Sequence, residues 1–165
     1  MQIASTPLPS LTAGTPLPAI RIATVNTSSG AKGSIHDDDT ARQMGYAGGF
    51  VPGVTVMGYM ARLMNEVFGT AWLRTGRFDS RLRLPTYAGI DVTVEGTVVE
   101  EPSSANGGRV TVELRVLDPD GRTTSFATAS CVAGTEQQAG TSHDGGSGPA
   151  AAGNLRQSQG RTDRA

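Results

Sequence analysis

The second half of the chain repeats an alternation of apolar and polar residues. In the first such run, Phe78, Leu82 and Leu84 share one side, and arginine and aspartate occupy the other. A period of two predicts strands with one buried and one solvated face, as in antiparallel sheets. Turn-forming residues separate the runs, and Asp-Pro-Asp-Gly at 118–121 is a strong hairpin signal. The predicted strands cover residues 77–84, 91–98, 110–116 and 125–132.

Residues 54–68 form the longest apolar segment, and their pattern is that of a helix. The polar positions recur at spacings that place them in one narrow stripe, namely Thr55, Tyr59, Arg62 and Glu66. Apolar residues cover the rest of the circumference, so we expect the helix to be buried on nearly every side. Pro52 suits its first turn and Gly69 its end. Arg62 and Glu66 are spaced to form an ion pair along it.

Two simpler features precede this helix. Residues 1–17 carry three prolines and predict an extended lead-in. Residues 19–25 alternate and predict a first strand, with Ile20 and Ile22 facing inward and Val25 as a further candidate.

A polar loop rich in glycine and serine follows the first strand and leads to a short predicted helix. Asp38 is the expected N-cap, because a carboxylate can accept hydrogen bonds from the unpaired N–H groups of the first turn. The helix includes residues 40–44, and Gly45 is expected to end it.

The predicted order is strand, short helix, long helix and four strands. A helix that is apolar on most sides needs a sheet curled around it, which predicts an α+β fold. The domain is expected to cover residues 18–133, and a homodimer with a continuous sheet would cover the helix better than one copy. From residue 134 to 165 the chain is rich in glycine, serine, glutamine and charge. Such a segment cannot offset its ordering entropy, so a disordered tail is expected.

Composition narrows the classes of partner. The net charge of −1 predicts no nucleic-acid partner, because such proteins usually carry a basic patch. No apolar run is long enough to span a bilayer, and the N-terminus lacks the features of a signal peptide, so we expect a cytoplasmic protein without a membrane partner. The single cysteine, Cys131, is expected to be a small buried residue and not a nucleophile.

Four short segments resemble the MaoC-like hydratase/dehydratase family, which includes the (R)-specific enoyl-CoA hydratases. They are Ser-Ile-His-Asp-Asp at 34–38, Gly-Tyr at 45–46, Phe-Val-Pro-Gly at 50–53 and Arg-Leu-Pro-Thr-Tyr-Ala-Gly-Ile-Asp at 83–91, and Ala41 between the first two also matches. Their order and spacing carry the resemblance. It implies the hot-dog fold, in which a curved antiparallel sheet wraps a long central helix. It also implies an acyl thioester or polyketide-like substrate and no cofactor.

The resemblance implies roles for individual residues. His36 matches the family's histidine, which moves a proton across a thioester-conjugated double bond. The backbone N–H groups of Gly53 and Val54 match the helix start that holds the thioester oxygen. Unpaired donors and the positive end of the helix dipole suit the negative charge that develops there. Tyr59, on the polar stripe, is a further candidate for contact with the substrate.

Three positions depart from the family pattern. The catalytic aspartate, five residues before the histidine, is replaced by Ala31; the Asn-Pro pair is replaced by Gly33 and Ser34; and the histidine at the helix start is Pro52. Ala31 and Ser34 remain candidates for substrate contact. Hydration needs one group to take a proton and another to deliver one, so we expect weak or no simple hydration of enoyl-CoA. A one-base reaction in specialised metabolism, such as isomerisation, dehydration of an activated substrate or cyclisation, fits better.

Several alternatives stay open. His36 could be a structural residue in a degenerate subunit, or in an acyl-binding protein that pairs with an active partner. A thioesterase would need a carboxylate near the central helix, and Glu66, near its far end, is the only one there. The aspartates at 37–39 are consecutive and would fan around a helix start, so no metal site is expected. The arginine row Arg77, Arg81 and Arg83 could attract coenzyme A phosphates, but a solvated strand face is the preferred interpretation.

Overall fold

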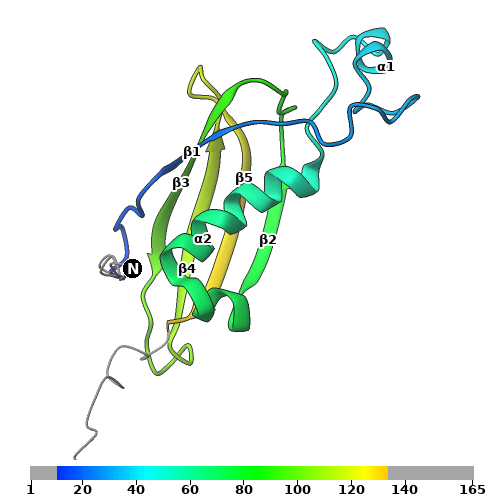
Figure 1. Cartoon of the computed structure of the whole chain (residues 1–165). Coiled ribbons are helices and arrows are strands. Elements are labelled where there is room, and N and C mark those ends of the chain that lie inside the picture. The colour runs from blue at the N-terminus through cyan, green and yellow to red at the C-terminus, as the bar shows by residue number, and fades with distance from the viewer. Residues whose placement is uncertain (1–10, 134–165) are drawn as a thin grey trace, which may run out of the picture. The chain divides into compact units, whose positions relative to one another are not determined.

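Five antiparallel strands form one sheet in the order β1-β3-β4-β5-β2 (Figure 1). The structure is a computed structural model, and it describes residues 11–133. The predicted tail and the first ten residues of the predicted lead-in lie outside this range. The strands are β1 (Ile20–Ala23), β2 (Arg77–Leu82), β3 (Asp91–Glu100), β4 (Arg109–Leu117) and β5 (Thr123–Val132).

Strands β3, β4 and β5 follow one another as a meander, and β2 and β1 form its two edges. The alternation predicted from sequence is confirmed: the valines at 92, 94, 98, 110, 112 and 116 are fully buried on one face. The 118–121 turn is also confirmed, because the Gly121 N–H donates to the Asp118 carbonyl over 2.9 Å. The apolar side chains of the meander therefore form a continuous floor for the helix.

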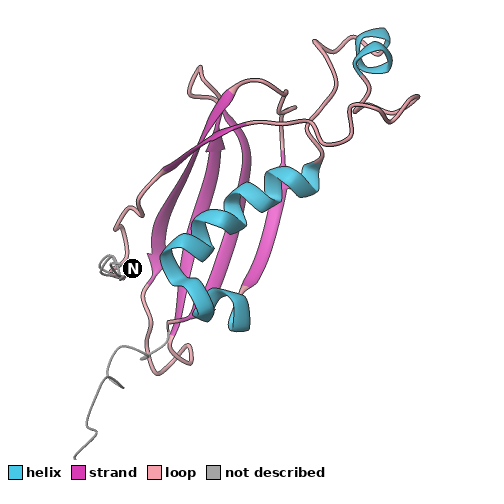
Figure 2. Ribbon diagram, in the orientation of Figure 1, coloured by secondary structure: helices cyan, strands magenta, loops and turns pink. Residues whose placement is uncertain are grey.

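Helix α2 (Gly53–Thr75) crosses this floor (Figure 2). Its buried side chains are Val56, Met60, Leu63, Met64 and Phe68. The predicted helix does end at Gly69, but a second helical stretch that the sequence did not predict follows it. Gly69 has a non-helical backbone with φ 49°, which a glycine adopts without a steric penalty, and the helix resumes after this kink. Trp72 in the resumed turn packs edge-on against Phe78 of β2, with ring centroids 6.2 Å apart.

Within one chain, α2 is not buried on nearly every side, so that prediction is wrong for the single chain. The sheet covers one face of the helix, while Val54 is 76% exposed and Leu73 is 73% exposed. The Arg62–Glu66 pair is confirmed, with Nε and Oε1 2.7 Å apart. Among the described residues the other apolar positions of α2 are thus only partly covered, since Met57, Ala61 and Val67 are half-buried.

The first strand is shorter than the predicted range of 19–25, and Val25 is 61% exposed, so its inward placement is wrong. Ile22 is buried as expected. The chain before β1 already runs beside β3: Leu17 lies in the core, and its N–H donates to the Gly96 carbonyl over 2.8 Å. A side chain on Gly96 would press against Leu17, which explains the glycine at this position.

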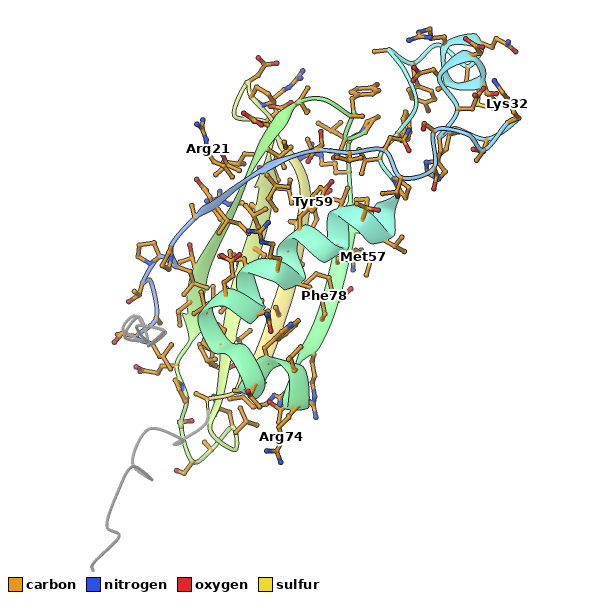
Figure 3. All side chains as sticks on the ribbon, viewed as in Figure 1. Arg21, Lys32, Met57, Tyr59, Arg74 and Phe78 are labelled. Atoms are coloured by element: carbon orange, nitrogen blue, oxygen red, sulfur yellow. The ribbon has the colours of Figure 1, made fainter. Side chains whose placement is uncertain are left out.

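Helix α1 (Asp38–Gln43) lies in a segment that projects beyond the sheet, with Lys32 near its outer end (Figure 3). Its N-cap is Asp37, which corrects the prediction of Asp38. The Asp37 carboxylate accepts from the Thr40 N–H over 3.1 Å and from the Thr40 hydroxyl over 2.9 Å. These hydrogen bonds, from the Thr40 hydroxyl first, lower the pKa of Asp37, and Lys32 at 3.4 Å adds to the effect. Met44 closes the helix and Gly45 follows with φ 90°, as predicted.

Candidate functional site

A cavity of about 430 Å³ opens between the start of α2, the end of β2 and the loop that follows α1. Its volume is in the range of small-molecule sites. Most of its walls are apolar, and the polar groups that reach it are few. The lining residues are Ile35, His36, Tyr46, Phe50, Val51, Gly53, Val56, Leu82, Arg83, Leu84, Pro85, Thr86 and Ser125.

His36 lines this cavity in a defined orientation. Its Nδ1 lies 2.9 Å from the backbone oxygen of Phe50. A carbonyl oxygen only accepts, so Nδ1 carries the proton in this contact and donates it. The neutral imidazole then has its lone pair on Nε2, the nitrogen on the other side of the ring. His36 is thus arranged as a proton acceptor at Nε2.

Further hydrogen bonds hold the backbone around His36, including one from its N–H to the Ser34 hydroxyl over 3.2 Å. The Phe50 N–H donates to the Ile35 carbonyl over 2.9 Å, and the Asn26 amide donates to the His36 carbonyl over 2.8 Å. A side chain on Gly49 would collide with that same His36 carbonyl. Asp38 accepts from the Gly49 N–H over 2.7 Å, which ties the start of α1 to this loop. The site therefore depends on a glycine that lets two backbone segments approach closely.

The start of α2 supplies the backbone donors. The helix N-cap is Pro52, which makes no side-chain capping hydrogen bond. Pro52 accepts through its carbonyl from Thr55 and Val56, but no acceptor is found among the described residues for the N–H groups of Gly53 and Val54. Gly53 lines the cavity, and a side chain there would collide with Leu82. The helix start thus offers unsatisfied donors and a positive dipole end to an anionic oxygen.

The sequence-predicted site residues fall into two groups. His36 and Gly53 line the cavity, and Val54 directly follows Gly53. Ala31 and Ser34 do not line it: they close an exposed turn, in which the Ser34 hydroxyl donates to the Ala31 carbonyl over 2.8 Å. Tyr59 also lies outside the cavity, and its hydroxyl accepts from the Val25 N–H over 3.4 Å (Figure 3).

Among residues 11–133, no carboxylate lines the cavity. Asp37 and Asp38 are engaged with Thr40, Gly49 and Arg42 around α1. Glu66 pairs with Arg62 and is not a lining residue. The imidazole of His36 is therefore without an acidic partner in the described part of the site.

Sequence reasoning missed two hydroxyl groups in the lining, those of Thr86 and Ser125, both buried. It also placed Arg83 on a solvated strand face. Arg83 is exposed, but it lines the cavity as well. The alternation of β5 does place Ser125 inward, together with Ala127, Ala129 and Cys131. The alternation gives no signal that this row of inward side chains ends at a cavity.

Neither a metal centre nor a reactive thiol accompanies the cavity in the described residues. No three side chains among histidine, cysteine, aspartate and glutamate lie close enough there to hold a metal ion. Cys131 is fully buried, as predicted, and burial raises the pKa of its thiol to about 11. None of the helices between residues 11 and 133 combines the length and apolarity that crossing a membrane requires.

Solved structures of known proteins share this fold. One is the ChsH1–ChsH2 complex from Mycobacterium tuberculosis, at 23% identity and a TM-score of 0.60 over 74% of this chain and 98% of that chain. Another is a MaoC-like dehydratase from Rhodospirillum rubrum, at 20% identity and a TM-score of 0.59 over 74% of this chain and 92% of that chain. A third is the (R)-hydratase of A. caviae involved in PHA biosynthesis, at 16% identity and a TM-score of 0.54 over 74% of this chain and 98% of that chain.

The sequence comparisons add no closer relationship. No protein-family model matches the chain, and no curated protein matches it. The predicted α+β fold is confirmed: this chain has a hot-dog-like fold whose structural neighbours include MaoC-like dehydratases and (R)-hydratases.

Proposed function

We propose that this protein binds an acyl thioester, or a related polyketide-like acyl chain, in the cavity beside α2 and moves a proton on it through His36. The observation that carries the proposal is the arrangement of His36 and the helix start on one apolar cavity. Fold similarity to dehydratases and hydratases supports the substrate class only by analogy.

The chemistry follows from the two groups. Nε2 of His36 takes a proton from the saturated carbon next to the thioester carbonyl. Negative charge then develops on the thioester oxygen, where the N–H groups of Gly53 and Val54 and the helix dipole stabilise it. The imidazolium returns the proton to a different carbon, which isomerises the double bond, or gives it to a departing hydroxyl, which dehydrates an activated chain. A single base serves each of these sequences.

Addition of water to a simple enoyl thioester is the reverse of the dehydration of a simple 3-hydroxyacyl thioester, so both reactions place the same, greater demand on the site. One proton must be exchanged at the oxygen while another is exchanged at the carbon, and in the family that the sequence resembles a second residue, the aspartate, shares this work. No carboxylate among the described residues lines the cavity. Proton transfer by one residue, in isomerisation, dehydration of an activated substrate or cyclisation, is therefore the proposed chemistry.

Deuterium exchange tests this proposal without knowledge of the natural substrate. Saturated and β,γ-unsaturated acyl-CoA thioesters are incubated with the protein in D₂O, and deuterium incorporation is followed by mass spectrometry. We expect incorporation by the wild-type protein and its loss in the His36→Asn variant. Exchange that is equal in the two proteins, or absent for every thioester, would contradict the proposed role of His36.

A second copy of the chain is the proposed partner. The segment that contains α1 projects from the sheet and packs against no other helix or strand of the described chain to any large extent (Figure 1). Apolar side chains at the cavity remain exposed in the single chain, including Leu82 at 49%, Tyr46 at 43% and Leu84 at 42%. A homodimer would cover them, and sedimentation equilibrium tests for it.

One alternative is a non-catalytic subunit that binds the acyl chain for an active partner. The missing carboxylate favours it, since the cavity and the helix start would be retained for binding alone. The deuterium experiment separates the two, because this alternative predicts thioester binding without exchange.

A further inference from the structure

Ser125 is a buried polar group that the chemistry of His36 does not use. The residue is 1% exposed, and its hydroxyl has no hydrogen-bond partner among the described residues. It is also part of the cavity wall. Buried hydroxyl groups normally have a partner, so this one calls for a physical explanation.

The sheet register fixes where this hydroxyl lies. Ser125 on β5 stands opposite Leu82 on β2 and opposite Val116 on β4. Leu82 is the residue that packs against Gly53 at the start of α2. Ser125 is thus on the cavity floor, one strand away from the side chain that contacts the helix start.

Packing alone does not require a serine at this position. The inward positions that follow on β5 are Ala127, Ala129 and Cys131, all buried and all without a strong hydrogen-bonding group. The other buried hydroxyl of the lining, of Thr86, donates to the Thr124 hydroxyl over 3.4 Å, and Thr124 in turn donates to the Val116 carbonyl over 3.3 Å. Of these two buried hydroxyl groups, only that of Ser125 is left without a hydrogen-bond partner among the described residues.

We propose that Ser125 is a specificity-determining residue that hydrogen-bonds to a hydroxyl or keto oxygen carried by the acyl chain itself. The inference rests on the proposed thioester function and narrows its substrate class to oxygen-bearing acyl chains. It assigns the thioester carbonyl to the start of α2 and a second oxygen of the same ligand to Ser125.

The selectivity has a simple origin. In the free protein the Ser125 hydroxyl is buried in the cavity wall and has no partner among the described residues. A chain with a suitably placed oxygen supplies the missing hydrogen bond. A purely hydrocarbon chain leaves the hydroxyl unpaired and gains nothing from it.

Calorimetric titration with matched pantetheine thioesters tests the inference. The probes are the hexanoyl thioester and its analogues with one hydroxyl or keto oxygen on carbon 3, 4 or 5. We expect at least one oxygenated analogue to bind wild type about tenfold more tightly than the hexanoyl thioester. In Ser125→Ala this advantage should vanish, while hexanoyl binding is retained or improved.

Ser80→Ala is the matched control. Ser80 lies on the neighbouring strand at the position opposite Ala127, so its side chain is on the same sheet face but outside the cavity lining. This variant should keep the advantage of the oxygenated ligand. If Ser125→Ala does not fold, Ser125→Cys has a similar size and a much weaker donor, and the same loss is expected.

The outcomes separate the two levels of the proposal. Equal binding of hexanoyl and oxygenated thioesters by wild type, or an advantage that survives in Ser125→Ala, would overturn the role of Ser125 and leave thioester binding standing. Failure of every thioester to bind would overturn the proposed function, and the role of Ser125 with it.

Discussion

The imidazole Nδ1 of His36 lies 2.9 Å from the backbone oxygen of Phe50, fourteen positions further along the chain. This single contact fixes the ring orientation and leaves Nε2 as the acceptor nitrogen. It also joins the segment before α1 to the residue that precedes Val51 and the start of α2. The orientation of the base and the position of the helix start are consequently coupled.

Replacing His36 by asparagine separates the structural and chemical parts of this residue. The asparagine amide can donate to the Phe50 carbonyl as Nδ1 does, but it offers no basic nitrogen at the Nε2 position. We expect a Tm close to that of the wild type, together with a loss of about a hundredfold or more in thioester deuterium exchange. Thermal unfolding checks the expected Tm, and the rate of deuterium exchange checks the expected loss of activity. Full exchange activity in this variant would show that His36 is not the base.

Gly49→Ala should disturb the same site without touching the imidazole. The added carbon would collide with the His36 carbonyl, which is backbone and cannot swing away. We expect a loss of roughly 1–3 kcal/mol in the free energy of unfolding, and weaker exchange activity. Gly58→Ala is the control, because a side chain at Gly58 meets nothing within 4 Å and alanine favours the helix. Wild-type stability in Gly49→Ala would contradict the close approach seen here.

An aspartate at position 31 tests the departure from the family pattern. Ala31 lies in an exposed turn and does not line the cavity. We therefore expect slow crotonyl-CoA hydration in wild type and no large gain in Ala31→Asp, as measured by loss of the enoyl absorbance. A gain of about a hundredfold, the size of an added acid–base group, would show that this turn reaches the substrate in the working protein.

Protonation of Asp37 should loosen α1. Hydrogen bonds from Thr40 hold the pKa of Asp37 below its ordinary value of 3.8. The stabilisation is therefore present above that value and is lost as the pH falls through the lower pKa of the folded state. Hydrogen exchange of the amides at 41–44, corrected for intrinsic rates, should rise in that acidic window. Asp37→Asn keeps a capping oxygen but cannot titrate, so its α1 protection should not show this transition.

The thiol of Cys131 should be inert in the folded protein. Its pKa of about 11 leaves roughly one molecule in a thousand as thiolate at pH 8, and the side chain is fully buried. Alkylation by iodoacetamide should be slow in buffer and fast in denaturant. Rapid labelling of the native protein would mean that β5 opens far more readily than its position between β4 and β2 implies.

The sequence pattern predicted the meander well, because each strand alternates cleanly over one solvated face. It did not predict features that depend on tertiary contacts. Gly69 breaks the helix as its type predicts, but the further helical turn after it, where Trp72 packs on Phe78, has no signal in the pattern. Asp37 and Asp38 are the same residue type side by side, so the sequence does not show which of them caps α1. The backbone conformation decides it, because Asp37 is extended and Asp38 is already helical.

The site was less predictable than the fold. The position of His36 was found by resemblance, but its partner is a backbone carbonyl, which carries no side-chain signal. Ser125 belongs to a regular strand pattern, and only the start of α2 near it turns that inward position into a cavity wall. Conversely, Ala31 and Ser34 are near His36 in sequence, and the Ser34 hydroxyl accepts from the His36 N–H over 3.2 Å, yet neither residue lines the cavity.

The central claim is that the start of α2 holds a thioester carbonyl, and infrared spectroscopy of a bound ligand tests it most directly. A hexanoyl-CoA labelled with ¹³C at the thioester carbonyl is added to excess protein, and the isotope-edited carbonyl band is recorded. Val56→Phe, which fills part of the cavity, is the control. We predict that the bound carbonyl absorbs at a lower frequency than in water, because the N–H groups of Gly53 and Val54 and the helix dipole polarise it. A bound carbonyl at the frequency found in water or higher, or the same band in Val56→Phe, would contradict the account.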